Sequence, residues 1–209
     1  MKKVITVLFA MMMTTSAFAD GGMIGIKYGT GELEATKNSY TAGSNTYAAQ
    51  TKAKDHEYGA IFFELNVPEV AGLSLGIDYI PYTATVSVDG NSSDSYVELS
   101  DHTTLYGLYT MDVAGVSPFV KLGYSKADVA AFANYDGTTI DSSDDNMSGI
   151  TYAVGVQAEV MDGVMGRFEA SYTEYDKVSA NTTSNGSTSV TKSADADLTT
   201  FSVAIAKSF

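Results

Sequence analysis

Apolar and polar residues alternate over long stretches of this chain, with the period of two that is typical of β-strands. The final residues show the pattern clearly, because Phe201, Val203 and Ile205 occupy every second position and the chain ends on Phe209. Such stretches predict eight strands. They cover roughly residues 22–33, 55–66, 73–88, 96–111, 117–130, 149–161, 164–178 and 197–209.

The connections between these strands are short and long in turn. Short segments (67–72, 112–116 and 162–163) follow the second, fourth and sixth strands, and Asp162-Gly163 is a strong hairpin signal. The other connections are long, polar and rich in Ser, Thr, Asn and Asp. An even number of strands with alternating loop lengths favours an up-and-down antiparallel barrel.

The first residues carry a different pattern, which predicts export. Lys2 and Lys3 precede an apolar run over residues 4–13, and Ala17-Phe18-Ala19 forms a small-residue cleavage site. We therefore expect a signal peptide at 1–19 and one mature domain at 20–209. The apolar run is shorter than the ~20 residues that a spanning helix needs.

Composition narrows the classes of function. After cleavage the chain would keep ten of its 12 basic residues and all 25 acidic ones, which argues against a nucleic-acid partner. The chain has no cysteine, so disulfides and thiolate metal sites are excluded. A mean hydropathy near zero fits alternating strands with one face in lipid.

Two of the predicted strands carry a family resemblance. Residues 117–124 (SPFVKLGY) and 167–176 (RFEASYTEYD) resemble strands of the small eight-stranded outer-membrane barrel superfamily, which includes the transmembrane domain of OmpA, OmpX and the opacity proteins. The resemblance implies an all-β, eight-stranded antiparallel transmembrane meander, with short periplasmic turns and longer extracellular loops. It also implies a location in the outer membrane of a Gram-negative bacterium, in contact with lipid and lipopolysaccharide.

The C-terminal strand is similar to the assembly signal of such barrels, which implies the barrel assembly machinery as a partner. Phe201, Val203, Ile205 and Phe209 carry that similarity. Lys207 departs from it, because the pattern usually has an apolar or aromatic residue there. We expect this lysine to snorkel to the periplasmic interface.

If the apolar faces contact lipid, the charged residues within strands must face the interior, since Lys or Arg at the lipid midplane costs roughly 2–4 kcal/mol. The predicted interior charge network comprises Lys27, Glu64, Asp78, Lys121, Glu159, Arg167 and Glu169, with Gln157 beside it. Arg167 is the only arginine, and we expect it to pair with Glu64 and Glu169. An eight-stranded barrel is narrow enough for side chains to fill, which predicts a polar plug; a narrow ion path is the alternative.

No cofactor, catalytic or metal-binding motif stands out, so we expect a non-enzymatic monomer with a structural or adhesion-like surface role. The loops expected to contact a host or environmental ligand are 34–54, 131–148 and 179–196. Several alternatives stay open. They are a porin-like channel, a lipid-modifying enzyme using Ser100 and His102 from one strand face, divalent-cation binding by 131–148, and glycosylation at Asn91 or Asn146.

Overall fold

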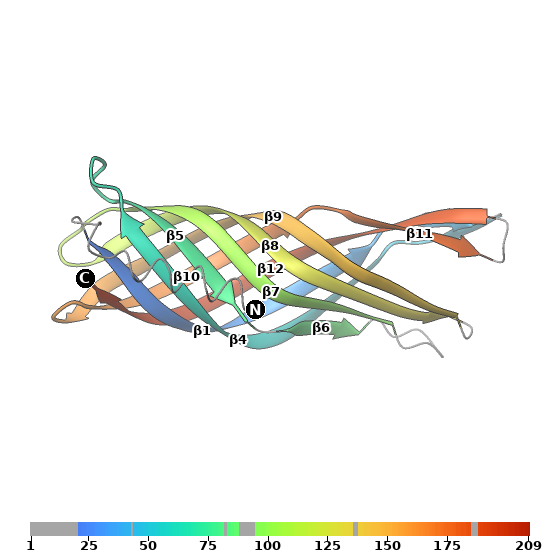
Figure 1. Cartoon of the computed structure of the whole chain (residues 1–209), viewed down its shortest axis with the longest axis horizontal. Coiled ribbons are helices and arrows are strands. Elements are labelled where there is room, and N and C mark those ends of the chain that lie inside the picture. Colours follow the sequence, from blue (N-terminus) through green and yellow to red (C-terminus); the bar gives the residue numbers. More distant parts are fainter. Residues whose placement is uncertain (1–20, 43, 82, 88–94, 136–137, 185–187) are drawn as a thin grey trace.

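The computed structural model describes residues 21–209 except 43, 82, 88–94, 136–137 and 185–187. The expected signal peptide and Asn91 lie outside the described residues. Twelve strands are present in the described part, and eight of them form a closed antiparallel barrel (Figure 1). Within the described residues no helix is long and apolar enough to cross a membrane.

The barrel closes because the first strand pairs with the last. Each barrel strand is hydrogen-bonded to its neighbours in the order β1-β4-β5-β7-β8-β9-β10-β12, and β1 pairs with β12 from Met23↔Ser208 to Lys37↔Ala194. This confirms the predicted eight-stranded up-and-down meander. The barrel strands are β1 (Gly22–Lys37), β4 (Gln50–Asn66), β5 (Leu73–Ile80), β7 (Ser95–Thr110), β8 (Ser117–Tyr135), β9 (Thr138–Met161), β10 (Val164–Tyr175) and β12 (Thr188–Ser208).

The strands continue far beyond the predicted boundaries at one end of the barrel. Most of 131–148 belongs to β8 and β9, and most of 179–196 belongs to β11 (Val178–Ser184) and β12, so the prediction of loops there was wrong. Residues 34–54 contain the ends of β1 and β4 and a hairpin of β2 (Tyr40–Ala42) and β3 (Asn45–Tyr47). A further short strand, β6 (Ala84–Ser87), pairs with β7.

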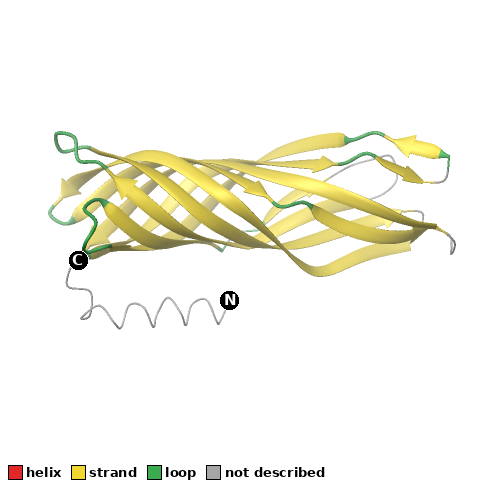
Figure 2. Ribbon diagram, turned by 90° about the horizontal axis from the view of Figure 1, so that it is seen from above, coloured by secondary structure: helices red, strands yellow, loops and turns green. Residues whose placement is uncertain are grey.

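The missed extensions have a physical cause. Outside a membrane the outer face of a strand needs no apolar residues, so the period-two signal is lost while the backbone ladder continues. Figures 1 and 2 show the resulting long, narrow barrel: the C-terminus and short turns lie at one end, and β11 and the tips of β8 and β9 lie at the other.

The outer face carries an apolar band bounded by aromatic residues. Ile26, Leu105 and Ile205 are all more than 60% exposed in the isolated chain, as expected of residues that contact lipid. Along the far edge of this band lie four exposed tyrosines, which we call the tyrosine girdle: Tyr28, Tyr124, Tyr152 and Tyr172. At the other edge Phe209 stacks on Phe63 with ring centroids 6.1 Å apart, and its backbone pairs with Gly22.

The inner face is built around aromatic rings that small residues accommodate. The Cβ of a side chain at Gly25 would lie 2.4 Å from ring carbons of Phe62, and one at Gly155 would lie 2.3 Å from the ring of Phe119. Gly59, in contrast, faces outward, and its Cβ would have no neighbour nearer than 3.9 Å. Glycine at inward positions therefore lets large side chains fill a narrow lumen.

This packing predicts opposite outcomes for two matched substitutions. Gly25→Val should lower the free energy of unfolding by about 1–3 kcal/mol, because the added side chain overlaps the Phe62 ring. Gly59→Val should leave it nearly unchanged, because its side chain enters open space. Equilibrium urea unfolding of the refolded protein in micelles, followed by circular dichroism, measures both. Equal destabilisation by the two variants would contradict the packing described here.

Candidate functional site: the barrel interior

Arg167 on β10 is the central residue of the lumen layer nearest the short turns. Its guanidinium binds both carboxylate oxygens of Glu64 on β4, with Nη1–Oε1 at 2.6 Å and Nη2–Oε2 at 2.8 Å. Nη2 also donates to Gln157 Oε1 at 2.7 Å, and the Tyr106 hydroxyl donates to Glu64 Oε1 at 2.7 Å. All four side chains are buried. This bidentate pair is the strong geometry for an ion pair that must be desolvated.

Two aromatic rings enclose the guanidinium of Arg167. The ring centroids of Phe62 and Phe119 lie 4.8 and 4.9 Å from Cζ. At these distances each ring attracts the cation through its quadrupole and excludes water from it. The inward glycines of β1 and β9 are what give these rings space.

The next layer holds two lysines and two carboxylates in an alternating arrangement. Lys27 Nζ contacts Asp78 Oδ2, and it lies 2.9 Å from Glu169 Oε1. Lys121 Nζ lies 2.7 Å from Glu169 Oε1 and 3.4 Å from Asp78 Oδ2, and it sits 4.5 Å from the centre of the Tyr106 ring. Each charge therefore has two opposite charges as neighbours, which offsets the cost of burial.

The structure brings together six of the seven residues expected in the interior network, as three cations and three carboxylates. Arg167 pairs with only one of its two expected partners, because Glu169 is held by the lysines. Glu159 lies apart from the network. The β9–β10 register shifts beside it, and its exposed carboxylate accepts a hydrogen bond from Gly163 N at 2.7 Å in the adjoining turn.

A ladder of hydroxyl groups lies beyond the charged layers. Thr104 and Ser125 are hydrogen-bonded at 2.7 Å, Ser125 contacts Thr151, and Thr151 bonds Thr173 at 2.7 Å. The four residues come from four consecutive strands, β7 to β10, so the ladder ties these strands together inside the barrel. Sequence reasoning missed it because Ser and Thr are common; only their shared inward position distinguishes them.

An apolar cluster, here called the apolar cap, fills the lumen beyond the hydroxyl ladder. Its buried members come from seven strands: Leu33, Ala84, Leu99, Ala127, Val129, Met147, Tyr175, Ala196 and Leu198. The sequence analysis did not identify it. A signal was present, because Leu33 follows Ile24, Ile26 and Tyr28 on the opposite face of the same strand and so breaks the outward apolar pattern.

The proposed pairing of Ser100 and His102 on one strand face was wrong. A bulge shifts the β7–β8 register between Ser100 and Thr103, and Asp101 has a φ of 51°. The extra residue reverses the alternation, so that Leu99 and His102 both point inward while Ser100 lies on the opposite face from Leu99. His102 is buried with its ring edge-on to Tyr175, centroids 6.0 Å apart.

The remaining sequence-predicted residues lie on the outer surface. Phe201, Val203 and Ile205 alternate outward along β12, and Lys207 is exposed beyond them. Asn146 is exposed on β9. Within the described residues no group of three or more His, Asp or Glu side chains is placed to hold a metal ion.

The chain matches a known domain family over nearly its whole length. The family described as outer membrane protein beta-barrel domain matches residues 5–209. A search of curated proteins gave no match.

Solved structures share the fold at low sequence identity. Outer membrane protein AlkL, determined in DMPC bilayers, superimposes with a TM-score of 0.58 at 14% identity, covering 90% of each chain. The outer membrane protease OmpT of Escherichia coli gives 0.52 at 11% identity, covering 91% of this chain and 97% of that one. Ail, the attachment invasion locus protein of Yersinia pestis, gives 0.49 at 10% identity, covering 90% and 99%. The likenesses to AlkL and OmpT show the fold alone.

Removing one member of the Arg167–Glu64 pair should destabilise the barrel strongly. Glu64→Gln leaves the guanidinium buried without its counter-charge, and we expect a loss of about 3–5 kcal/mol in the free energy of unfolding. The double variant Glu64→Leu/Arg167→Met should recover much of that loss, because no uncompensated charge remains. Lys126→Met on the exposed face is the control. Urea unfolding checks all three, and a mild effect of Glu64→Gln alone would contradict the described pairing.

Proposed function

This chain belongs to the family of outer membrane protein beta-barrel domains, and we propose that it is a non-conducting, non-enzymatic barrel that presents its extended extracellular strands as an interaction surface. Membership of this family carries with it residence in the outer membrane of a Gram-negative bacterium. The short turns and the C-terminus then lie on the periplasmic side, and the strand extensions lie on the outside.

The main support for a non-conducting barrel is that side chains fill the lumen at two successive levels, the charged layers and the apolar cap. The charged layers contain equal numbers of cations and carboxylates, each engaged with its neighbours, so they leave no uncompensated charge to attract an ion. Beyond them the apolar cap replaces polar lining with buried hydrocarbon. A permeating ion would have to break buried ion pairs and also lose its hydration within the cap, and both steps are costly.

The strand extensions support the second half of the proposal. Strand β8 continues for 11 residues past Tyr124 in the tyrosine girdle. At about 3.3 Å per residue and a tilt of ~40°, this projects the β8–β9 hairpin roughly 28 Å beyond the girdle. A hydrogen-bonded ribbon of this length presents a far more defined surface than a loop would.

The charge of the extensions favours partners that carry basic groups. The exposed carboxylates described beyond the girdle outnumber the exposed lysines there. The carboxylates are Glu32, Glu34, Asp55, Glu57, Asp128, Glu174 and Asp176, and the lysines are Lys52, Lys54, Lys126 and Lys177. Such a surface steers cationic partners toward it through long-range attraction.

The bulge in β7 supports a non-enzymatic role, because it separates the one serine–histidine pair that the sequence suggested. The serine–histidine mechanism that the sequence suggested requires the two side chains to lie within hydrogen-bond reach of each other. Ser100 and His102 are the pair that the sequence offered, and the bulge directs them to different faces.

Conductance measurements test the closed lumen. The refolded protein, with its folding verified by heat-modifiable gel mobility, should give no discrete conductance steps in a planar bilayer. Reproducible steps whose size or selectivity changes on Lys121→Gln would overturn the closed lumen and establish the channel. A porin of known conductance, refolded under the same conditions, controls for insertion.

Shortening the extensions tests the interaction surface. Val129 pairs with Asp145, so replacing residues 130–144 by a tight turn closes the hairpin without changing the register below it. We expect cells expressing this variant to lose adherence to epithelial monolayers while the barrel still folds. The matched variant closes β11–β12 between the paired residues Val178 and Ala194. Full adherence by both variants would rule out the projecting β8–β9 and β11–β12 hairpins as the contact surface.

A further inference from the structure

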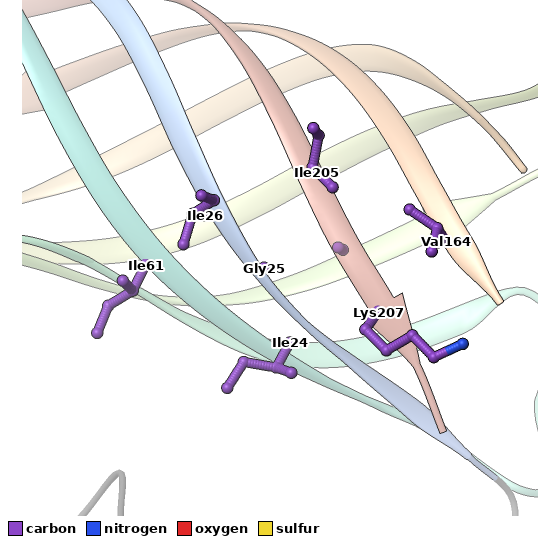
Figure 3. Close-up of a pocket in the computed structure, with 8 residues that line it drawn as sticks. Ile24, Gly25, Ile26, Ile61, Val164, Ile205 and Lys207 are labelled. Atoms are coloured by element: carbon purple, nitrogen blue, oxygen red, sulfur yellow. The ribbon is translucent and has the colours of Figure 1, made fainter. Parts of the chain in front are cut away.

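A groove on the outer wall plays no part in the proposed function. It lies where β1 meets β12, near the periplasmic end, and has a volume of about 420 Å³. We call it the seam groove. Its lining consists of Ile24, Gly25, Ile26, Ile61, Val164, Ile205, Ala206 and Lys207 (Figure 3).

The groove follows from the packing of the lumen. Gly25 and Ala206 pair across β1 and β12 and belong to the inward face, where they lie against Phe62. Their backbone therefore forms a floor with no outward side chain. Ile24, Ile26 and Ile205 project outward around this floor, and Ile61 and Val164 form the walls on β4 and β10. The result is a furrow of hydrocarbon running along the strand direction.

A second groove continues the first along the same seam. It has a volume of about 630 Å³, and its lining includes Tyr28, Phe168, Phe201 and Val203. Tyr28 pairs with Val203, directly after the outward pair Ile26–Ile205 of the seam groove. The two grooves together form one apolar track from the periplasmic edge toward the tyrosine girdle, which suits a fatty acyl chain lying along the wall.

The periplasmic end of the track carries a cation. Figure 3 shows Lys207 at this end of the groove, past Ile205, and its Nζ donates to the carbonyl of Asp162 at 3.0 Å. The other lysines described as exposed, at 52, 54, 126 and 177, all lie beyond the girdle at the opposite end. Lys207 is thus the one exposed cation described at the periplasmic edge of the outer wall.

A carboxylate belongs to the adjoining turn. Asp162 is exposed, and its backbone carbonyl is the one that Lys207 binds. None of the described ion pairs joins Lys207 to a carboxylate. One cation beside one carboxylate is complementary to a headgroup that carries both a phosphate and a primary ammonium, which can donate hydrogen bonds to a carboxylate as choline cannot. A purely anionic headgroup would meet repulsion from the carboxylate.

We propose that the seam groove binds a phosphatidylethanolamine molecule of the periplasmic leaflet, with its phosphate on Lys207, its ammonium beside Asp162, and an acyl chain along the track. A phosphate oxygen is a charge-assisted acceptor for Lys207 Nζ. Lipopolysaccharide is excluded from the site because it occupies the opposite leaflet.

The absence of tryptophan from the chain makes a direct test simple. Ile61→Trp places a single fluorescent reporter at the edge of the groove, and Val120→Trp places one on β8, across the barrel, as the control. Each is reconstituted in phosphatidylcholine vesicles that contain a fixed fraction of brominated phosphatidylethanolamine or brominated phosphatidylcholine. Bromine quenches tryptophan on contact, so relative quenching reports which lipid lies there.

We expect brominated phosphatidylethanolamine to be preferred about two- to fivefold at the Ile61→Trp reporter, the range for an exposed charge interaction, and not at Val120→Trp. Lys207→Gln should abolish the preference, and Lys126→Gln should leave it intact. Equal quenching at both reporters, or a preference that survives Lys207→Gln, would overturn the proposal. Stronger quenching by brominated phosphatidylglycerol than by the ethanolamine lipid would also overturn it, since Asp162 would then not select an ammonium group.

Discussion

Every backbone N–H and C=O group within the hydrocarbon of a membrane must be hydrogen-bonded by the protein itself, because lipid offers no partner. This chain meets that constraint by pairing its first strand with its last, which removes both edges of the sheet. The other features follow from that closure. A closed ring of eight strands encloses a lumen so narrow that side chains fill it, and it directs every second residue into a space where charge must be compensated.

Alternation and charge explain how much could be read from the sequence. Lys27, Lys121 and Arg167 lie in strands whose opposite face is apolar, so their inward direction was predictable from the cost of placing charge in lipid. The choice of partners was predictable only in part: the pairing of Arg167 with Glu64 was expected and is found, but the pairing of Glu169 with the lysines was not expected. The choice depends on the stagger between strands distant in sequence, which sets Glu64 across the lumen from Arg167 and leaves Glu169 to the two lysines.

The extracellular half was harder to predict for a different reason. Water solvates the outer face there, so residues such as those of 131–148 show no apolar period although their backbones form a regular ladder. The bulge at Asp101 likewise leaves no mark in composition, yet it exchanges the two faces of β7 and directs Leu99 into the apolar cap. Alternation of apolar and polar residues therefore indicates which part of a strand contacts the membrane. It does not indicate whether the chain continues as a strand outside the membrane.

The pairing of Met23 with Ser208 also has a kinetic consequence. The two ends of the described barrel lie almost the whole chain apart, so the seam is the contact with the highest entropy of closure and it belongs to the slow, non-local class of folding events. The hairpins joined by short turns need only local contacts, whereas the pairing of β1 with β12 needs all the intervening strands to be in place. We therefore expect the seam to close last during assembly. Until that step both strands expose an unpaired edge, which makes the unclosed sheet the species most exposed to aggregation.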